Sequence, residues 1–270
     1  MVDESYDLAF SLGQACACSL VLRTANLQFA SFPLDWIARG SLTVRTELVA
    51  SRFAGWLEKD DFVYEGTNPM NGLGVFVNKR TGFQHLHDFP DRPIEESFDE
   101  VREKFRRREE RLCRALDGAR RVLCVYISRP AGPDVAPDEL VRCRKTLSDA
   151  FPNASFDLIH LVCEEGRSFN DRLVREISEG ITEIVFDYRD PRRDVMIEDA
   201  GRAILELGVK VADPRSEAEK KEFERLKAKK WREKRLKRKM DKYGVSSRAA
   251  LAVAQVAEVF RRLFGRPSVR

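Results

Sequence analysis

Short apolar segments alternate with amphipathic segments through the second half of this 270-residue chain. Segments such as RVLCVYIS and FDLIHLVC are rich in β-branched and aromatic residues and have the length of buried strands. Strands that alternate with helices are typical of βαβ units, in which neighbouring strands run parallel. The expected strands are 121–128, 156–163 and 181–188, and the expected helices are 137–150, 169–178 and 193–207.

The first half of the chain adds a strand at 6–12, followed by a helix that begins at Gln14 and carries Cys16 in its first turn. The other expected elements are helices at 42–57 and 93–116 and short strands at 75–78 and 82–87. Together these patterns predict an α/β fold with a largely parallel sheet of four or more strands flanked by helices. Apolar residues make up 43% of the chain, which is enough to fill a core of this size.

Charge is concentrated near the C-terminus. The segment 216–243 holds thirteen Lys and Arg against six Asp and Glu, so it carries +7 while the rest of the chain carries −3. It lacks Gly and Pro and is predicted to form a basic helix, followed by an amphipathic helix at 247–264. This divides the chain into an α/β domain, 1–214, and a helical C-terminal extension, 215–270. The basic helix is either a solvated helix or a contact for nucleic acid or an anionic surface.

Membrane-spanning and secreted classes are disfavoured. The sequence has no run of about 18 apolar residues, and its acidic N-terminal segment lacks the apolar stretch of a secretory signal. We therefore expect a cytoplasmic protein whose six cysteines are reduced thiols. Cys113, Cys124 and Cys163 lie in apolar stretches and are expected to pack as small hydrophobic residues.

Cys16 is the strongest candidate for a reactive cysteine. It follows a predicted strand and lies at the start of a helix, where unpaired N–H groups and the helix dipole stabilise a thiolate. Gly13 permits a tight turn beside it, and the N–H groups of 14–16 would suit an oxyanion. Cys18 points to another side of the helix. The alternative is that Cys16 is a buried thiol without a catalytic role.

A cysteine nucleophile needs a base, and the chain has three histidines. His160 lies in an apolar strand and is expected to be a hydrogen-bonded core residue. His85 and His87 fall on one side of an extended segment and are followed by Asp88. The four residues Cys16, Cys18, His85 and His87 also raise the alternative of a zinc site.

Four motifs in fixed order make the chain resemble the putative papain-like cysteine peptidase family of bacteria and viruses, a domain of largely unknown function. The resemblance extends over residues 6–190. The matching motifs are Ser11-Leu12-Gly13 with Cys16, Ser31-Phe32-Pro33-Leu34-Asp35-Trp36-Ile37, His87-Asp88-Phe89, and Arg107-Arg108 with Arg111. The resemblance implies that Cys16 is the nucleophile and His87 the base, ahead of His85, with Asp35 or Asp88 as the orienting carboxylate.

The hypothesis that follows is a cysteine-dependent hydrolase or acyl-transferase that acts on a small-molecule, peptide or glycan-linked substrate and needs no cofactor or metal. Arg107, Arg108 and Arg111 either form a solvated helix face or bind an anionic group of the substrate. Ser11, Gly13 and Gln14 are further candidates for contacts to the substrate. The competing hypothesis is a non-catalytic binding or assembly module that uses the basic helix.

Overall fold

The computed structural model describes residues 5–13, 16–128, 135–189, 193–222, 224–225 and 240. Contacts divide the chain into a unit of Met1–Asp213 and a unit of Pro214–Arg270, and each is described by itself. The first unit contains two sheets, which makes it a mixed α/β fold.

The larger sheet has five strands in the order β1-β6-β7-β9-β8. Neighbouring strands are parallel from β1 to β9, and only β8 runs antiparallel to its neighbour. The predicted largely parallel sheet is therefore confirmed. Its strands are β1 (Leu8–Gly13), β6 (Arg121–Ile127), β7 (Ser155–Cys163), β8 (Leu173–Ser178) and β9 (Ile181–Phe186).

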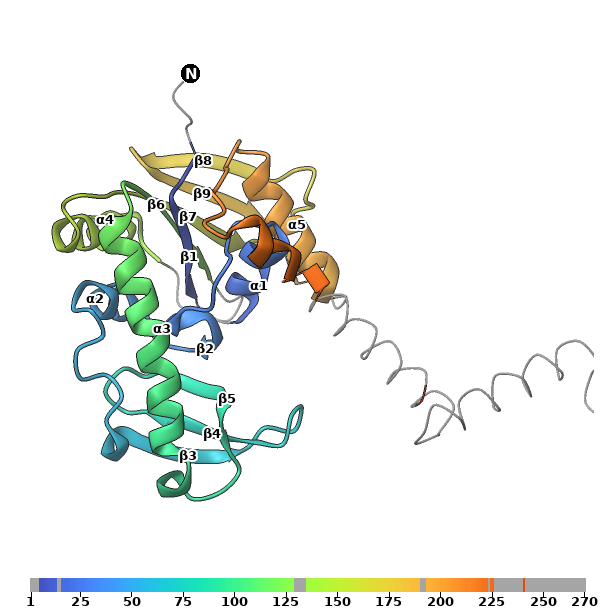
Figure 1. Ribbon diagram of the computed structural model, residues 1–270. Helices are drawn as coiled ribbons and strands as arrows, with labels where there is room; N and C mark the ends of the chain where they lie inside the picture. The colour runs from blue at the N-terminus through green and yellow to red at the C-terminus, as the bar shows by residue number, and fades with distance from the viewer. Residues whose placement is uncertain are drawn as a thin grey trace, which may run out of the picture. The chain divides into compact units, whose positions relative to one another are not determined.

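Helices cover both faces of this sheet (Figure 1). Alternate residues of a strand point to opposite faces, so Leu123 and Val125 of β6 pack into a core with α1 and α5, while Val122 and Cys124 join the core beneath α2 and α4. The helices are α1 (Cys16–Thr24), α2 (Leu42–Ala50), α4 (Pro137–Ala150) and α5 (Arg193–Leu205).

The smaller sheet is antiparallel, with the order β2-β5-β4-β3. The long helix α3 (Phe98–Gly118) runs past both sheets in Figure 1. Its buried side chains are the apolar residues that the sequence periodicity selects, Phe98, Val101, Phe105, Leu112 and Leu116. The strands are β2 (Ile37–Ala38), β3 (Phe62–Thr67), β4 (Leu73–Asn78) and β5 (Gln84–Pro90), and the short 3-10 helices are η1 (Pro33–Trp36), η2 (Lys59–Asp61) and η3 (Ile94–Glu96).

The helix expected at 169–178 is wrong, because residues 173–178 form β8. This strand pairs with β9 through a two-residue turn at Glu179 and Gly180, where Gly180 has a φ of +72°. Such a turn joins two strands of a hairpin. Because most of β8 is exposed, its mixture of polar and apolar residues resembles an amphipathic helix in the sequence.

The helix expected at 42–57 ends at Ala50. Arg52 and Phe53 have φ values of +55° and +62°, which a right-handed helix does not accommodate. The expectation that Phe53, Trp56 and Leu57 are buried is nevertheless confirmed, since each is at most 5% exposed. β3 was not expected from the sequence.

Little of the C-terminal unit is described. Residues 217–222, 224 and 225 are helical, with ion pairs from Lys220 to Glu217 and from Arg225 to Glu222. The rest of the predicted basic helix, apart from residues 216 and 240, and all of the helix predicted at 247–264 lie outside the described residues. Within the described part of the chain, no helix is both long enough and apolar enough to cross a membrane.

Candidate functional site

Cys16 is the first residue of α1, at the carboxyl end of β1, and its side chain is partly buried. The Ser19 hydroxyl lies 3.3 Å from the Cys16 carbonyl oxygen and 3.1 Å from that of Asp35. The first turn of α1 is thereby fastened to η1. Since ligands of parallel α/β sheets bind at the carboxyl ends of the strands, Cys16 has a position suited to chemistry.

Gly13 closes β1 in a backbone conformation that favours glycine, with a φ of +101°. A Cβ atom at this position would lie 2.5 Å from Nη1 of Arg45, so the turn also needs the missing side chain. The Ser11 hydroxyl oxygen accepts a hydrogen bond of 3.0 Å from the Gly13 N–H. Ser11 is fully buried and supports the turn from within. Gln14 lies outside the described residues.

Arg45 is a buried cation beneath this turn that the sequence analysis missed. Its side chain is fully buried in α2, and its Nη2 donates to the carbonyl oxygens of Ile37 and Arg39. Among the described residues, its Nε and Nη1 have no hydrogen-bond partner. Burial lowers the pKa of Arg45 to about 10. The signal in the sequence was an arginine three residues after Leu42, on the side of the helix that otherwise holds core residues.

Asp35 is fully buried in η1, and its carboxylate anchors the surrounding loop. It accepts hydrogen bonds from Arg23 at 2.8 Å, from Gln28 at 2.9 Å and from the Phe32 N–H at 2.9 Å. Burial raises the pKa of Asp35, although the Phe32 N–H and the charge of Arg23 act in the opposite direction. These partners occupy the carboxylate, so its position in the structure is that of a support for η1 and not of a partner to a histidine.

His87 is exposed on β5 and faces η1. Its ring packs edge-on against Trp36, with 6.1 Å between the centroids, and the Arg23 guanidinium lies 5.9 Å from the Trp36 ring. Because Arg23 belongs to α1, a continuous set of contacts joins the helix of Cys16 to His87 through Trp36.

Asn71 is the hydrogen-bond partner of His87, with 3.1 Å between Nδ2 of Asn71 and Nδ1 of the ring. The Asn71 amide also donates to the Leu86 carbonyl and accepts from the Leu73 N–H, each at 3.0 Å. These backbone contacts turn Nδ2 toward the ring, so a neutral His87 holds its proton on Nε2. Asn71 lies in the turn-rich segment 66–74, which the sequence analysis assigned no role.

His85 and Asp88 form a separate, fully enclosed pair. Nδ1 of His85 lies 3.1 Å from Asp88, whose other oxygen accepts a 2.8 Å hydrogen bond from Lys104. Burial alone would raise the pKa of Asp88, but the hydrogen bond from His85 and the charges of His85 and Lys104 lower it to about 2. Asp88 therefore orients His85, not His87. The His85 ring is 0% exposed and packs among aromatic side chains, namely Trp56, Phe62, Phe89 and Phe105.

The three arginines of α3 have different surroundings. Arg111 donates a 2.7 Å hydrogen bond to the Ser31 carbonyl oxygen in the loop before η1. Arg108 is half-buried over Phe105, and its Nη1 has no hydrogen-bond partner among the described residues. Burial lowers the pKa of Arg108, while the nearby Asp88 and Asp35 carboxylates raise it. Arg107 is exposed and lies 3.8 Å from Glu103.

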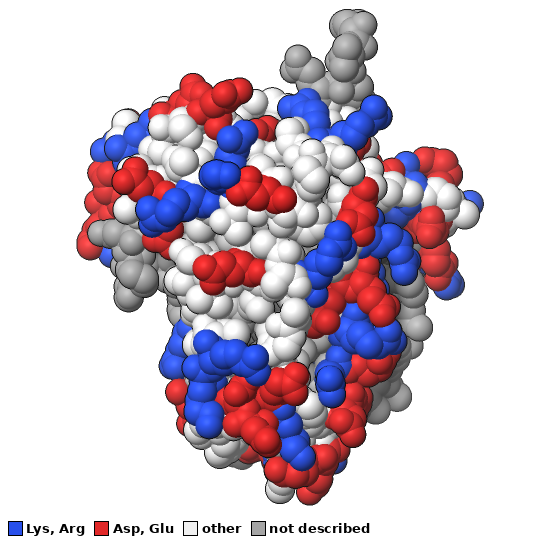
Figure 2. Space-filling model, turned by 90° about the vertical axis from the view of Figure 1, so that its left-hand side faces the viewer, with Lys and Arg blue, Asp and Glu red and all other residues white. Residues whose placement is uncertain are grey.

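Charges of both signs mix over the face of the molecule in Figure 2. A broad positive field is thus not a feature of this face.

All six cysteines lie among the described residues, and none of them forms a disulfide. Cys18 is fully buried, with its sulfur 3.2 Å from the Val125 carbonyl oxygen, and burial raises its pKa to about 12. Among the residues that the structure describes, no three His, Cys, Asp or Glu side chains are grouped to hold a metal ion. The zinc alternative involving Cys16, Cys18, His85 and His87 therefore has no support from the geometry.

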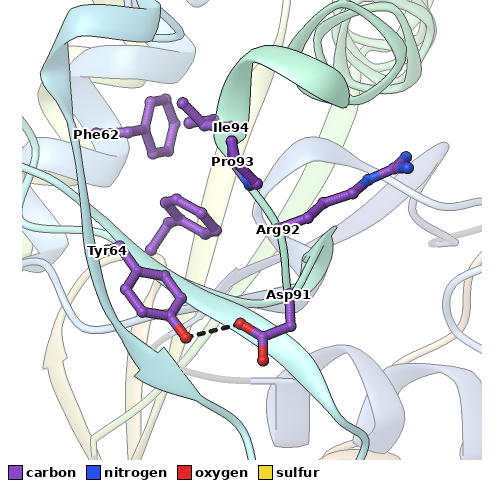
Figure 3. A pocket seen from close by; sticks show the side chains of 7 residues that line it. Phe62, Tyr64, Asp91, Arg92, Pro93 and Ile94 are labelled. Carbon is purple, nitrogen blue, oxygen red and sulfur yellow. Dashed lines mark hydrogen bonds between the residues drawn. The ribbon is translucent and has the colours of Figure 1, made fainter.

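The antiparallel sheet carries a surface pocket of about 480 Å³ (Figure 3), and two of its lining residues, Phe62 and Phe76, pack against Phe89 of the third motif. The Tyr64 hydroxyl donates a 2.7 Å hydrogen bond to Asp91 at its rim. The lining holds none of the residues that the sequence analysis selected. It consists of Phe62, Tyr64, Phe76, Asp91, Arg92, Pro93 and Ile94.

Half of the chain matches a known protein family. The model of the family described as putative papain-like cysteine peptidase matches residues 7–141, which is half of the chain. The matched segment contains all four motifs and ends inside α4, before β7. No curated protein and no solved structure matches the chain.

Proposed function

Because the chain belongs to the putative papain-like cysteine peptidase family, we propose that it is a cysteine-dependent hydrolase or acyl-transferase with Cys16 as its nucleophile. The observation that carries the proposal is the placement of Cys16 at the N-terminus of α1, directly beyond the carboxyl end of a parallel strand. Helix N-termini stabilise negative charge, so this position favours a reactive thiolate.

In the proposed reaction, Sγ of Cys16 attacks the carbonyl carbon of an ester, thioester or amide. A C–S bond forms, the bond to the leaving group breaks, and the leaving group takes up a proton. Attack by water or by an acceptor nucleophile then cleaves the acyl-enzyme and restores the thiol. N–H groups at the start of α1 are the natural donors for the oxyanion of the tetrahedral intermediate.

His87 is the better base of the two candidates on β5, because His85 is sealed in an aromatic core and engaged by Asp88. To accept the thiol proton on Nε2, His87 must hold its other proton on Nδ1. The Asn71 amide must then turn so that Oδ1 faces the ring. The Leu86 carbonyl oxygen then loses its hydrogen bond from Asn71 but still accepts one from Asn68, whose Nδ2 lies 3.2 Å away.

The substrate carries a negative group in this proposal, and Arg108 and Arg111 bind it. Arg111 contacts the loop before η1, and Arg108 on the same helix has a buried Nη1 with no hydrogen-bond partner among the described residues. Arg107 points to solvent and has no such role. Asp35 acts as a positioning residue that holds η1, and with it Trp36, against α1.

The test measures alkylation of each cysteine by iodoacetamide at neutral pH, with mass mapping of the labelled peptides. We expect Cys16 to react at least about tenfold faster than the other five thiols. Cys16→Ala should abolish the fast phase, and Cys18→Ala serves as the matched control two residues away. Equal rates at Cys16 and at the remaining thiols would overturn the proposal.

The base is tested with two histidine variants. We expect His87→Gln to slow alkylation of Cys16 and to change the dependence of that rate on pH, whereas His85→Gln should alter stability without changing that pH profile. Asn71→Asp presents an acceptor on either side of its carboxylate, so it should favour the Nδ1–H form and raise the rate. A pH profile that is identical in wild type and in His87→Gln would exclude His87 as the base.

A further inference from the structure

Polar residues follow apolar ones along one face of three neighbouring strands of the parallel sheet. On the face beneath α4, Leu158 is followed by His160 in β7 and Ile181 by Glu183 in β9. Ser128 follows Tyr126 directly beyond β6. In the sheet, Tyr126 is paired with His160 and His160 with Glu183, so these side chains share one face. Ser128 lies at the carboxyl end of β6, the edge where such sheets bind ligands.

The three polar side chains are hydrogen-bonded in a defined order. Ser128 Oγ lies 2.7 Å from His160 Nε2, and His160 Nδ1 lies 3.2 Å from a carboxylate oxygen of Glu183. The other Glu183 oxygen forms a 2.8 Å ion pair with Arg175 of β8. Hydroxyl, imidazole and carboxylate thus follow one another at the distances of a nucleophile, its base and the group that orients the base.

The surroundings hold this arrangement in place. The Tyr188 hydroxyl donates to the Ser128 carbonyl oxygen, and the Ser128 N–H donates to the Leu161 carbonyl oxygen. Hydrogen bonding to His160 lowers the pKa of Glu183, which keeps its carboxylate ionised. Ser128 is 9% exposed and Glu183 8%, whereas His160 is 1% exposed, so the imidazole is enclosed and the residues on either side of it approach the surface. The prediction that His160 is a hydrogen-bonded core residue is confirmed, and its two partners give it a further chemical capacity.

We propose that Ser128, His160 and Glu183 form a second nucleophilic centre, of the serine-hydrolase type, that acts on small activated esters. Ser128 Oγ attacks the ester carbonyl carbon while its proton passes to His160 Nε2, and the C–O bond to the alcohol breaks as that proton passes to the alcohol. Water then cleaves the acyl-serine, with its proton returning through His160. This centre does not depend on Cys16.

The alternative is that these three groups only stabilise the sheet through their hydrogen bonds. The two explanations predict different reactivity of the Ser128 hydroxyl. A hydroxyl that only stabilises the sheet has no enhanced nucleophilicity. A serine activated by a His–Glu pair reacts with fluorophosphonates, which transfer phosphorus to Oγ and release fluoride. The small reagent diisopropyl fluorophosphate suits a hydroxyl with little exposure.

The experiment incubates the full chain carrying Cys16→Ala with diisopropyl fluorophosphate and maps the adduct by mass spectrometry. We expect a single adduct on Ser128. It should disappear in the variant with Ser128→Ala and persist with Ser155→Ala, which changes an exposed serine at the opposite end of β7. Glu183→Gln keeps the size of the side chain and should slow labelling at least about tenfold.

Circular dichroism and thermal melting establish that each variant is folded before its rate is compared. Absence of an adduct on Ser128 in folded protein would overturn the proposal, and so would an unchanged rate in folded Glu183→Gln. Because the protein used in this experiment lacks Cys16, neither result bears on the cysteine proposal, which is tested separately by the alkylation of Cys16.

Discussion

The buried group of His85, Asp88 and Lys104 gives a quantitative prediction about the segment that carries His87. Asp88→Asn keeps the shape of the side chain and removes its charge. In the wild type, His85 and Lys104 contact the carboxylate at 3.1 Å and 2.8 Å, and the side chain of Asp88 is 2% exposed. The stabilisation therefore belongs to the ionised form of Asp88 in the folded chain.

The size of the effect follows from the pKa of Asp88, which falls from an ordinary value of 3.8 to about 2. A folded-state pKa below the unfolded value adds stability at pH values above the unfolded pKa, and this stability is lost as the pH falls toward the folded pKa. This lowering of the pKa corresponds to about 2 kcal/mol at neutral pH. About half of it should be lost by pH 3.

Urea unfolding of wild type and Asp88→Asn at pH 7, 5, 4 and 3 measures this effect. The variant should be less stable by about 2 kcal/mol at pH 7, and the difference should shrink to about half that value at pH 3. Asp91→Asn is a matched control, because Asp91 lies on the same segment but is bound by exposed Tyr64 and Thr67. A difference between wild type and Asp88→Asn that stays constant with pH would refute the reasoning.

Three other substitutions have expected outcomes. Gly13→Ala should destabilise the protein by about 2–5 kcal/mol in urea unfolding, because it places a side chain at a positive φ and against Arg45. It should also slow alkylation of Cys16, and an unchanged midpoint of urea unfolding would contradict the expected destabilisation. Asp35→Ala should lower the melting temperature by about 6–20 °C, because it leaves the partners of a buried carboxylate unpaired, and a loss under 2 °C would count against that role. Cys18→Ala should leave the thiol reactivity of the folded chain unchanged at pH 8, as a pKa of about 12 leaves about one thiolate in 10⁴.

The parallel sheet was predictable because its strands are buried on both faces. β6 and β7 are nearly continuous apolar segments, and short segments of this kind are typical of strands in a parallel sheet that is covered on both faces. β8 and β3 were not predictable from the same signal, since both are exposed edge strands. Their pairing depends on partners that become neighbours only in the folded chain, so local periodicity does not report it.

The candidate site was predictable at the positions where a local motif carries the chemistry, and less so where a partner is distant in sequence. Spacing placed Cys16 at the start of a helix, and the structure agrees. The family resemblance implied Asp35 or Asp88 as the carboxylate that orients His87, but Asp35 is bonded to Arg23 and β5 places Asp88 against His85. Asn71 contacts His87 across a turn, and Arg45 reaches the Gly13 turn from another helix. Neither contact leaves a pattern in the sequence.

The balance of charge at the junction of α1, η1, β5 and α3 bears on which intermediates it favours. Its two buried carboxylates, Asp35 and Asp88, are already paired with Arg23 and Lys104. Arg45 and Arg108 are additional cations, and each has a buried nitrogen without a hydrogen-bond partner in the described part of the chain. Unpaired buried cations cost stability unless an anion approaches them. A reaction that creates a thiolate or an oxyanion here would supply that charge, so Arg45→Met should slow alkylation of Cys16 in the folded chain. A faster or unaltered rate would show that Arg45 has no electrostatic effect on the thiol.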